Sequence, residues 1–472
     1  MSIEKRTDSL HLILSGDQFT PYSLAKKLNA VAVLESASFS QGKARYSILM
    51  LSEAFRVRQE ADGVYLMINE EKRRYPGNPR DILDALHDIA AENEAPENNI
   101  PLPASGIGYL SFEFAARCDT IAFPANQTDN LGIPEAEFMV GHIYIIFDHF
   151  NEKLHLFALN YREHEIDLEA AVRQVKSRLE DDDFSYLAPP KSIPAYSVLT
   201  DETLSKAQYL EKIDILKHHL TEGDIIQAVP SRRLQLKSGA DALDIYRRLR
   251  SITPSPYLIY LDFKEFQLLG ASPESLIKVK NRVALVPPIA GTMRRGKNEI
   301  EDARLKSELL ANPKERAEHL MLLDLARNDL GRVCEAGTVK VTKNTECEMF
   351  SHVMHLVSEV QGKLEPGKRS VDALRSVFPA GTVSGAPKIS AIEILSRIEP
   401  EKRNFYAGAV GYLQSNGDLD FCITIRSALK QGDTWTLQSG GGIVYASEPE
   451  REWEETNEKL MAMRAVFEGS IQ

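Results

Sequence analysis

The stretch VGHIYIIFDHFNEKLHLFALNY (residues 140–161) decides the fold, because it reads as two β-strands joined by a tight turn. Short runs of strand-forming and apolar residues, VGHIYIIFDHF and KLHLFALNY, lie on either side of the pair Asn151 and Glu152. Two strands that are joined by so short a turn run antiparallel. The segment therefore predicts an antiparallel hairpin in the first part of the chain.

Further strand-like runs occur in groups, with helices at intervals. The runs are IIQAVPSRRLQL, YLIYLDF, FQLLGAS and RVALVPPIAGT, and then YAGAVGYL, LDFCITIRSAL and TWTLQSGGGIVYAS. Before the first group, SKAQYLEKIDILKHHLTEG places Tyr209, Ile213, Leu216 and Leu220 on one helical stripe that ends at Gly223. Grouped strands with helices between them favour an α+β fold with a mostly antiparallel sheet over a βαβ array.

The composition limits the classes of protein to which the chain can belong. Its 472 residues suffice for two or three domains or one large body. A net charge of −12 disfavours nucleic acid and anionic membranes as partners. The four cysteines are too scattered for a disulfide scaffold or a zinc site, which suits a reducing compartment. No secretory signal and no apolar run of about 20 residues is apparent, so we expect a cytoplasmic protein.

Two segments rich in proline and polar residues interrupt the pattern, at residues 91–103 and 181–200. The second is the better candidate for a boundary. It predicts an N-terminal subdomain over residues 1–190 and a larger part over residues 200–472.

Two pairs of carboxylates have the spacing of neighbours on a helical face. Glu315 and Glu318 open the helical segment ERAEHLMLLDLARNDLGR (residues 315–332), and Glu452 and Glu455 repeat the spacing near the C-terminus. Four carboxylates from two helices can hold a hard divalent cation such as Mg²⁺, and an anionic substrate would complete the site. The alternative is that these side chains lie solvated on surface helices.

Three glycine-rich turns lie between strand and helix candidates: IAGT (residues 289–292), GTVSGAPK (residues 381–388) and SGGG (residues 439–442). Glycine lets the backbone approach a ligand closely and exposes N–H groups that can hold carboxylate or phosphate. GTVSGAPK is not a nucleotide-binding P-loop, because Ala386 and Pro387 precede its lysine. Each turn alone indicates tight geometry, but together with the carboxylate pairs they indicate a ligand site.

Several other polar residues have two interpretations. His355 lies between apolar neighbours, as a packed core histidine would. Arg426 alternates with apolar residues on a strand, which fits either edge solvation or a carboxylate clamp. Tyr406 fits a core position, and PSPY (residues 254–257) fits a rigid turn.

Together these segments resemble the chorismate-utilising enzymes. The resemblance covers residues 211–467 through the motifs GDIIQAVPSRR, PSPYLIYLDF, GASPES, PIAGT, AEHLMLLDLARNDLGR, SHVMHLVSEVQG, FPAGTVSGAPK, YAGAVGY, GDLDFCITIRS and EREWEETNEK. The first 190 residues match more loosely, through VLESA and ARYS. The resemblance implies a four-layer α/β/β/α sandwich of two large antiparallel sheets with helices outside.

A magnesium site and a chorismate site follow from this resemblance. Glu318 and Glu455 would bind Mg²⁺ directly, and Glu315 and Glu452 would support it through water. The ion would chelate the ring carboxylate of chorismate and withdraw electrons from the ring. The residues expected to hold or line the substrate are Gly291, Thr292, Thr382, Tyr406, Arg426, Gly440, Gly442 and Lys459.

The resemblance also assigns proton transfers. Glu274, in GASPES, corresponds to the acid that protonates the departing 4-hydroxyl. His355 corresponds to the histidine tied to the loss of pyruvate, which requires removal of the C2 proton.

Two positions distinguish the sister reactions of the family. Members that add water at C2 use a lysine base where this chain has Gln227, and a neutral amide cannot take up that proton. Members that form 4-amino-4-deoxychorismate often carry a nucleophilic lysine where this chain has Ala290. Both residues favour direct attack of ammonia at C2.

We therefore expect a magnesium-dependent carbon–oxygen lyase of tryptophan biosynthesis that converts chorismate and ammonia to anthranilate and pyruvate. Formation of 4-amino-4-deoxychorismate for folate synthesis is the alternative, because some enzymes of that type also lack the lysine. A non-catalytic subunit that binds chorismate or tryptophan is a second alternative. The retained acids and His355 argue against it, because pure binding needs no general acid.

Two partners are implied as well. None of the four cysteines lies in the G-x-C-x-G turn of a glutaminase, so a separate glutamine amidotransferase subunit would supply ammonia. VLESA resembles the tryptophan-binding element of feedback-inhibited members, which gives the first 190 residues a regulatory role; an ordinary strand end is the alternative. The residues expected to form this allosteric pocket are Glu35, Ser36, Arg45, Pro254, Ser255 and Tyr257.

Overall fold

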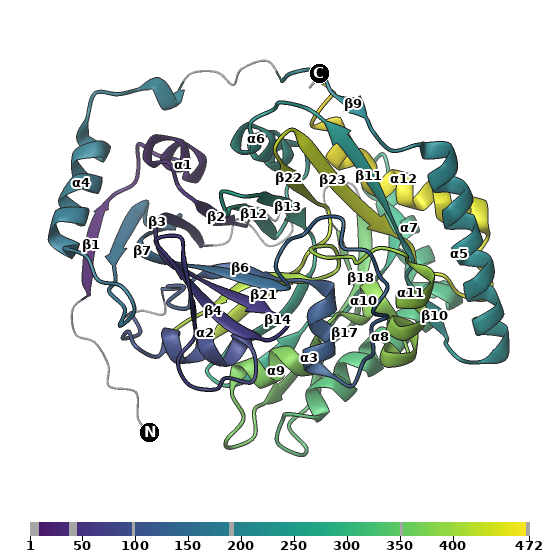
Figure 1. Ribbon diagram of the computed structural model, residues 1–472. Helices are drawn as coiled ribbons and strands as arrows, with labels where there is room; N and C mark the ends of the chain where they lie inside the picture. Colours follow the sequence, from purple (N-terminus) through teal and green to yellow (C-terminus); the bar gives the residue numbers. More distant parts are fainter. Residues whose placement is uncertain (1–8, 37–44, 97–99, 188–192, 350–352, 469–472) are drawn as a thin grey trace.

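The computed structural model describes residues 9–36, 45–96, 100–187, 193–349 and 353–468 (Figure 1). Its strands are β1 (Leu10–Ser15), β2 (Ala32–Glu35), β3 (Tyr46–Glu60), β4 (Gly63–Ile68), β5 (Glu71–Arg74), β6 (Ile107–Leu110), β7 (Ala136–Asp148), β8 (Lys153–Ala158), β9 (Ser197–Val198), β10 (Gln227–Ala228), β11 (Ser231–Lys237), β12 (Tyr257–Asp262), β13 (Gln267–Ser272), β14 (Ser275–Lys280), β15 (Val283–Val286), β16 (Ile289–Arg294), β17 (Lys340–Met349), β18 (Val353–Lys363), β19 (Gly385–Ala386), β20 (Ala409–Leu413), β21 (Leu419–Ile423), β22 (Ser427–Gln431) and β23 (Thr434–Gly440).

The helices are α1 (Pro21–Leu28), α2 (Ile82–Ala90), α3 (Ala115–Cys118), α4 (Leu168–Glu180), α5 (Glu202–Glu222), α6 (Ala242–Ile252), α7 (Glu299–Ala311), α8 (Pro313–Gly331), α9 (Ser370–Val377), α10 (Gly381–Ser384), α11 (Lys388–Ile398) and α12 (Pro449–Ala465), with short 3₁₀ turns η2 (Phe112–Phe114) and η3 (Ser185–Leu187). Within the described ranges, no helix is both long enough and apolar enough to cross a bilayer.

Two antiparallel sheets share the long strands β3 and β7. The order in sheet I is β1-β8-β7-β3-β2-β12-β13-β22-β23-β11-β9. The order in sheet II is β5-β4-β3-β7-β6-β20-β21-β14-β15-β18, with β16 and β17 also paired to β18. Register shifts between Met50 and Phe55 mark bulges in β3, and bulges bend a strand. One half of each long strand can therefore belong to each sheet.

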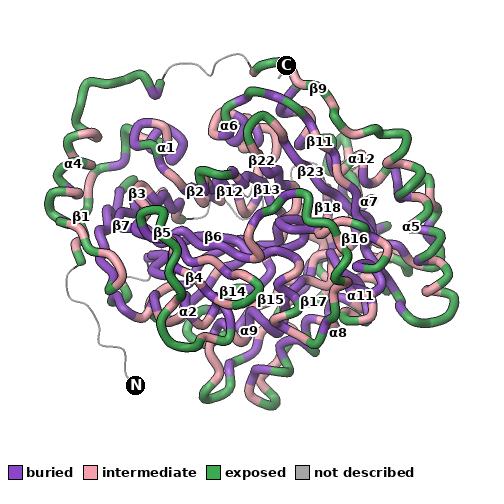
Figure 2. The backbone as a smooth tube through the Cα atoms, viewed as in Figure 1, coloured by how far each residue is buried: buried purple, intermediate pink, exposed green. Residues whose placement is uncertain are grey.

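The core follows from the alternation of side chains along the strands. In β12, Leu258 and Tyr260 join the apolar cluster that also holds residues of α1 and α6, whereas Ile259 and Leu261 join the cluster that also holds residues of sheet II. Helices α1, α4, α6 and α12 contact sheet I, and α2 and α9 contact sheet II. Figure 2 shows buried strands inside and more exposed helices around them. The predicted α+β class and four-layer order are confirmed.

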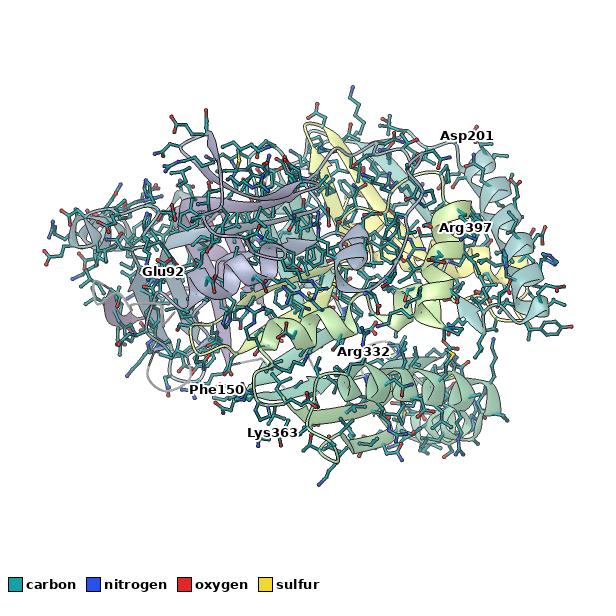
Figure 3. The ribbon with its side chains drawn as sticks, turned by 60° about the horizontal axis from the view of Figure 1, so that its bottom comes forward. Glu92, Phe150, Asp201, Arg332, Lys363 and Arg397 are labelled. Atoms are coloured by element: carbon teal, nitrogen blue, oxygen red, sulfur yellow. The ribbon has the colours of Figure 1, made fainter. Side chains whose placement is uncertain are left out.

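A separate lobe carries α7, α8, β16, β17 and β18, which contact one another. Leu305, Leu309, Met354 and Leu356 form its small apolar cluster. Figure 3 shows this part of the chain along one side of the molecule, with Arg332 and Lys363 labelled. We call it the α8 lobe.

The elements expected from the sequence are present. The hairpin of residues 140–161 is β7 and β8, and the stripe that contains Tyr209 lies on α5, which is capped by Gly223 in a left-handed conformation. Strands from residues 1–190 pair with strands from residues 200–472 in both sheets, through β2–β12 and β6–β20. The two parts of the sequence thus build common sheets.

Candidate active site

The candidate catalytic residues lie where strands pass from sheet I to sheet II. The chain leaves β13 and enters β14 through Glu274, and it leaves β21 and enters β22 through Arg426. The Ser272 hydroxyl donates to the Ile423 carbonyl at 2.6 Å, and the Ile423 amide donates to the Glu274 carbonyl at 3.0 Å. Arg426 has a φ of 51°, a conformation that non-glycine residues rarely adopt. The two crossings are therefore held against each other.

Glu274 is a half-buried acid beside a hydroxyl. The Thr382 hydroxyl, at the start of α10, donates to Glu274 Oε1 at 2.8 Å. Burial raises the pKa of Glu274 to about 7, although the Thr382 hydrogen bond and the charge of Lys459 oppose the rise. A carboxyl with this pKa carries a proton in a large share of molecules at neutral pH, as a general acid requires. Thr382, which was expected to line the substrate pocket, thus lies against the candidate acid.

His355 reaches the site from β18 in the α8 lobe. Its Nδ1 lies 3.0 Å from the carbonyl oxygen of Gly291. Burial lowers the pKa of His355, and the charge of Arg426 lowers it further. The ring is therefore neutral at pH 7, and a bond to a carbonyl places the proton on Nδ1. This tautomer makes Nε2 the basic nitrogen.

The IAGT segment, expected as a turn, lies within strand β16, where Gly291 forms a bulge that favours glycine. The φ of Gly291 is 68°, and an added Cβ would lie 3.1 Å from Glu315 Oε2. The backbone of Thr292 pairs with His355 across β16 and β18, but the Thr292 side chain lies outside the described residues. The bulge at Gly291 therefore lies next to both Glu315 of α8 and His355.

The carboxylate pairs come from the two predicted helices. Glu318, on α8, accepts a hydrogen bond at 3.5 Å from Nε2 of Gln227, which lies on β10. Burial raises the pKa of Glu318, and the charges of Glu315 and Glu455 raise it further. The electrostatic interaction between Glu318 and Glu455 shows that α8 and α12 bring carboxylates near each other.

The second pair of carboxylates, Glu452 and Glu455, lies on α12. Burial raises the pKa of Glu452, and repulsion by Glu455 adds to this rise. Glu452 Oε2 is buried and has no hydrogen-bond partner among the described residues. Glu455 is paired with Lys459 at 2.7 Å. The site therefore holds negative charge that the described side chains compensate only in part.

These residues fit a magnesium ion that arrives with its substrate. Across the described ranges, no three His, Cys, Asp or Glu side chains are grouped closely enough to ligate one ion. Mg²⁺ does not require such a group, because it commonly uses one or two carboxylates together with waters and substrate oxygens. The unpartnered Glu452 Oε2 and the repulsion around Glu318 are the features that a divalent cation would relieve.

Cationic and phenolic groups gather at the glycine turn after β23. Lys459 Nζ donates to the Gly440 carbonyl at 2.8 Å, and the Tyr406 hydroxyl lies 3.1 Å from where a Gly440 Cβ would stand. Burial raises the pKa of Tyr406 to about 12, so its hydroxyl remains a donor. Among the described side chains, no carboxylate lies within 4.0 Å of the Arg426 guanidinium. The turn can therefore receive a carboxylate.

The glycine turn also contacts two residues of β10 and α5. A Cβ on Gly442 would lie 2.4 Å from Gln227 Nε2, so the turn needs glycine to reach the amide. A Cβ on Gly441 would lie 3.3 Å from the Tyr209 hydroxyl, and the Tyr209 ring lies against Trp453 of α12. Sequence reasoning placed Tyr209 on an apolar stripe and missed its hydroxyl; nothing in the local pattern signals it.

A cavity of about 440 Å³ is lined by residues of β2, β3, β12, β14, β20 and β21 and by none of the candidate catalytic carboxylates. Four of the residues predicted for an allosteric pocket line it, namely Glu35, Ser36, Arg45 and Tyr257. The other two do not line it. Ser255 is buried and donates to the Ala271 carbonyl at 3.0 Å, while Pro256 replaces Pro254 in the wall.

Two acids at or near this cavity have cationic partners. Glu35 accepts a hydrogen bond from the Tyr246 hydroxyl at 2.7 Å and pairs with Arg250 at 3.1 Å. Arg45 pairs with Asp148 at 2.8 Å. In the wall itself, Asp420 pairs with Lys278 at 3.2 Å, and Asp418 accepts the amide groups of Asn281 and Asn416.

A family model described as chorismate binding enzyme matches residues 46–465. Two curated relatives are named anthranilate synthase component 1. The relative from Spirochaeta aurantia is 50% identical over 97% of this chain and 95% of its own length. The relative from Acetivibrio thermocellus is 37% identical over 96% of this chain and 93% of its own length.

Solved structures give the same grouping. The crystal structure of anthranilate synthase component I from Streptococcus pneumoniae TIGR4 matches with a TM-score of 0.79 and 35% identity, over 89% of this chain and 92% of that one. The menaquinone-specific isochorismate synthase of Escherichia coli matches with a TM-score of 0.73 over 99% of this chain and 96% of that one. At 19% identity, that second likeness concerns the fold alone.

Proposed function

The chain belongs to the chorismate-binding enzymes, and we propose that within this family it is the large subunit of an anthranilate synthase. Its similarity to anthranilate synthase component 1 from Spirochaeta aurantia extends over nearly the whole chain. The observation that carries the proposal is the contact of the Gln227 amide with Glu318 at the carboxylate site. An amide at this place can orient a nucleophile but cannot deprotonate water, which favours ammonia as the nucleophile.

Arg426, Lys459 and Tyr406 bind the carboxylates of chorismate at the glycine turn. The guanidinium offers paired N–H donors, and its burial strengthens a bond to a carboxylate. Lys459 is already oriented by the Gly440 carbonyl and Glu455. Substrate binding therefore needs little rearrangement on this side.

Glu318 and Glu455 hold Mg²⁺, with Glu315 and Glu452 supporting it through water. When bound, the ion supplies a Lewis acid that polarises the ring carboxylate of the substrate. The four carboxylates hold the ion from two sides, because Glu315 and Glu318 belong to the α8 lobe and Glu452 and Glu455 to α12.

In the first step, ammonia attacks C2, the ring double bonds shift, and the C4–O bond breaks. Glu274 gives its proton to the departing hydroxyl, which leaves as water. The attached nitrogen releases its extra proton to solvent. The product is 2-amino-4-deoxyisochorismate. The Thr382 hydroxyl keeps the Glu274 carboxyl oriented during the transfer.

In the second step, the C2 proton is removed and the C3–O bond breaks, so that the ring becomes aromatic and the side chain leaves as enolpyruvate. The enolpyruvate takes up one proton from solvent at its methylene carbon and becomes pyruvate. His355 accepts the proton through Nε2. Burial keeps the ring neutral, and the Gly291 carbonyl orients it. His355 and Glu274 thus serve successive steps from different lobes.

Two further parts of the proposal concern partners. A separate glutamine amidotransferase subunit supplies ammonia. L-Tryptophan inhibits by binding in the interior cavity, against Glu35, Ser36, Arg45 and Tyr257. The cavity volume of about 440 Å³ is typical of a pocket for a small molecule.

The test is one assay with the purified chain, chorismate, Mg²⁺ and an ammonium salt at alkaline pH. Blue-fluorescent anthranilate together with pyruvate is expected. A 4-amino product identified by mass would instead assign the folate branch. No turnover with ammonia or with the amidotransferase subunit would indicate a purely binding subunit.

A further inference from the structure

A second cavity, of about 260 Å³, lies between α5 and β11. Its walls include Lys212 from α5, Arg232 and Arg233 from β11, and Glu399 after α11. Asp201, the N-cap of α5, also lines it and is labelled in Figure 3. None of the residues assigned above to catalysis or to tryptophan binding lines this cavity.

The acids in the wall already have partners. Asp201 accepts the amides of Thr203 and Leu204 at the start of α5. Glu399 pairs with Arg403 at 2.6 Å and accepts the amide of Ser231 at 2.7 Å.

Glu401, in the same wall, pairs with Arg233 at 2.6 Å. It also accepts the side-chain amide of Asn130 at 2.8 Å. The hydrogen bonds and ion pairs of these acids therefore go to groups other than Lys212 and Arg232, although the charges of Glu399 and Glu401 also favour the charged form of Lys212 and so oppose the lowering of its pKa by burial.

Within the residues that the structure describes, Lys212 and Arg232 have no carboxylate in direct contact. Lys212 Nζ donates to the Ser231 carbonyl at 2.9 Å, and Arg232 donates only to the neutral side chains of Thr456 and Asn457. In the part of the chain that the structure describes, no carboxylate lies within 4.0 Å of either cation. Arg232 Nη1 is buried and has no hydrogen-bond partner there.

The electrostatics of the two cations agree with this geometry. Burial lowers the pKa of Lys212. Burial also lowers the pKa of Arg232, to about 10. A buried cation is costly unless an anion is close to it.

We propose that this cavity binds a small anion that carries carboxylate or phosphate oxygens. The ligand enters beside α5 and places its oxygens against Lys212 and Arg232. Hydroxyl and amide groups of Thr200, Ser205 and Gln208 line the same cavity and can donate to its other oxygens. The volume admits a small metabolite or inorganic phosphate.

Such a ligand would act on the helix that carries the catalytic carboxylates. The Arg232 guanidinium stacks over Trp453 at 4.0 Å and bonds Thr456 and Asn457, all on α12. Glu452 and Glu455 lie on the same helix. A ligand on Arg232 would therefore contact a side chain that is itself bonded to the helix of Glu452 and Glu455.

The experiment is calorimetric titration of the full chain with inorganic phosphate and, separately, succinate, at fixed ionic strength in chloride. One saturable site is expected for at least one of them. Lys212→Gln should weaken this binding at least tenfold. Lys217→Gln, on the same helix but outside the cavity, should leave it unchanged.

A further variant distinguishes the cavity from the catalytic turn. Arg426→Gln should retain phosphate binding, because Arg426 does not line the cavity. Loss of binding in Arg426→Gln with retention in Lys212→Gln would place the anion at the catalytic turn and overturn the proposal. Absence of saturable binding of either probe to the unmodified chain would overturn it as well. The readout does not depend on which product the enzyme makes.

Discussion

The carboxylates of the candidate active site, which we call the catalytic cluster, and the acid Glu35 at the interior cavity differ in how their negative charge is compensated. At the interior cavity, Glu35 is matched by Arg250 and the Tyr246 hydroxyl. At the catalytic cluster, Glu318 is buried near two other carboxylates, and its nearest donor is a neutral amide at 3.5 Å. The first arrangement is stable by itself, whereas the second needs further positive charge.

This difference indicates what each region is built to receive. Buried charges without partners lower the stability of a fold, so they persist where function requires them. The catalytic cluster is organised for a cation and a proton donor. The interior cavity is organised for a neutral or zwitterionic molecule that adds no net charge.

Removing one carboxylate of the catalytic cluster should have the largest effect. Glu318→Ala should lower kcat with ammonia about 10³-fold or more, because it removes a ligand of Mg²⁺; this corresponds to about 4 kcal/mol. Anthranilate fluorescence under saturating ammonium measures it. Asp324→Asn, an exposed change on the same helix, is the matched control and should retain activity. Near-normal turnover in Glu318→Ala would contradict the assigned role.

Removing the base of the second chemical step should have the next largest effect on the rate of anthranilate formation. His355→Ala should slow anthranilate formation about 10²- to 10³-fold, while chorismate is still consumed and the aminated intermediate accumulates. Chromatography with mass detection follows both species. His218→Ala, on the exposed surface of α5, serves as the control. Rapid release of pyruvate by His355→Ala would remove this residue from the second step.

A substitution of Glu274 tests whether a carboxylate of the catalytic cluster lowers the stability of the fold. The pKa of Glu274 is raised from 4.5 to about 7, so its ionisation destabilises the fold. Below pH 4.5 the carboxyl is protonated in both the folded and the unfolded protein and causes no loss of stability. As the pH rises from 4.5 through 7, the unfolded state is favoured by its ionised carboxylate, so the free energy of unfolding falls. Glu274→Gln should therefore stabilise the protein by about 2 kcal/mol at pH 8 and by much less at pH 5.

Urea denaturation at the two pH values measures this difference. Glu211→Gln, on the exposed side of α5, should show no such dependence on pH. An equal effect of Glu274→Gln at both pH values would mean that the carboxyl titrates normally.

The interior cavity should give the smallest effect. Ser36→Ala removes one hydroxyl from its wall and should raise the tryptophan concentration for half-inhibition about tenfold, which is about 1.4 kcal/mol. Inhibition curves at fixed chorismate measure the shift, with Ser251→Ala on α6 as control. An unchanged curve would show that tryptophan does not bind at Ser36.

Local patterns predicted the elements well, because helices and strands follow from periodicity. The segment of residues 315–332 lies almost wholly in α8, and Glu452 and Glu455 lie on helix α12, as their spacing predicted. The bulges that let β3 and β7 serve both sheets leave no trace in the alternation of side chains. Strand pairing over long distances therefore had to come from the structure.

The site was predictable only through the family resemblance. Glu274 and Thr382 are separated by 108 residues, and Gln227 and Glu318 by 91. No local spacing brings such residues together. The same reason explains why Tyr209 and Lys212 were missed, since their partners belong to α12 and β11.

The shared strands β3 and β7 also determine how the chain can be divided. Cutting it near residue 190 would leave β2 without β12 and β6 without β20. Each fragment would then present unpaired strand edges, which invite aggregation. We therefore expect the two fragments to be insoluble alone and to regain solubility only when they are produced together and assemble by complementation.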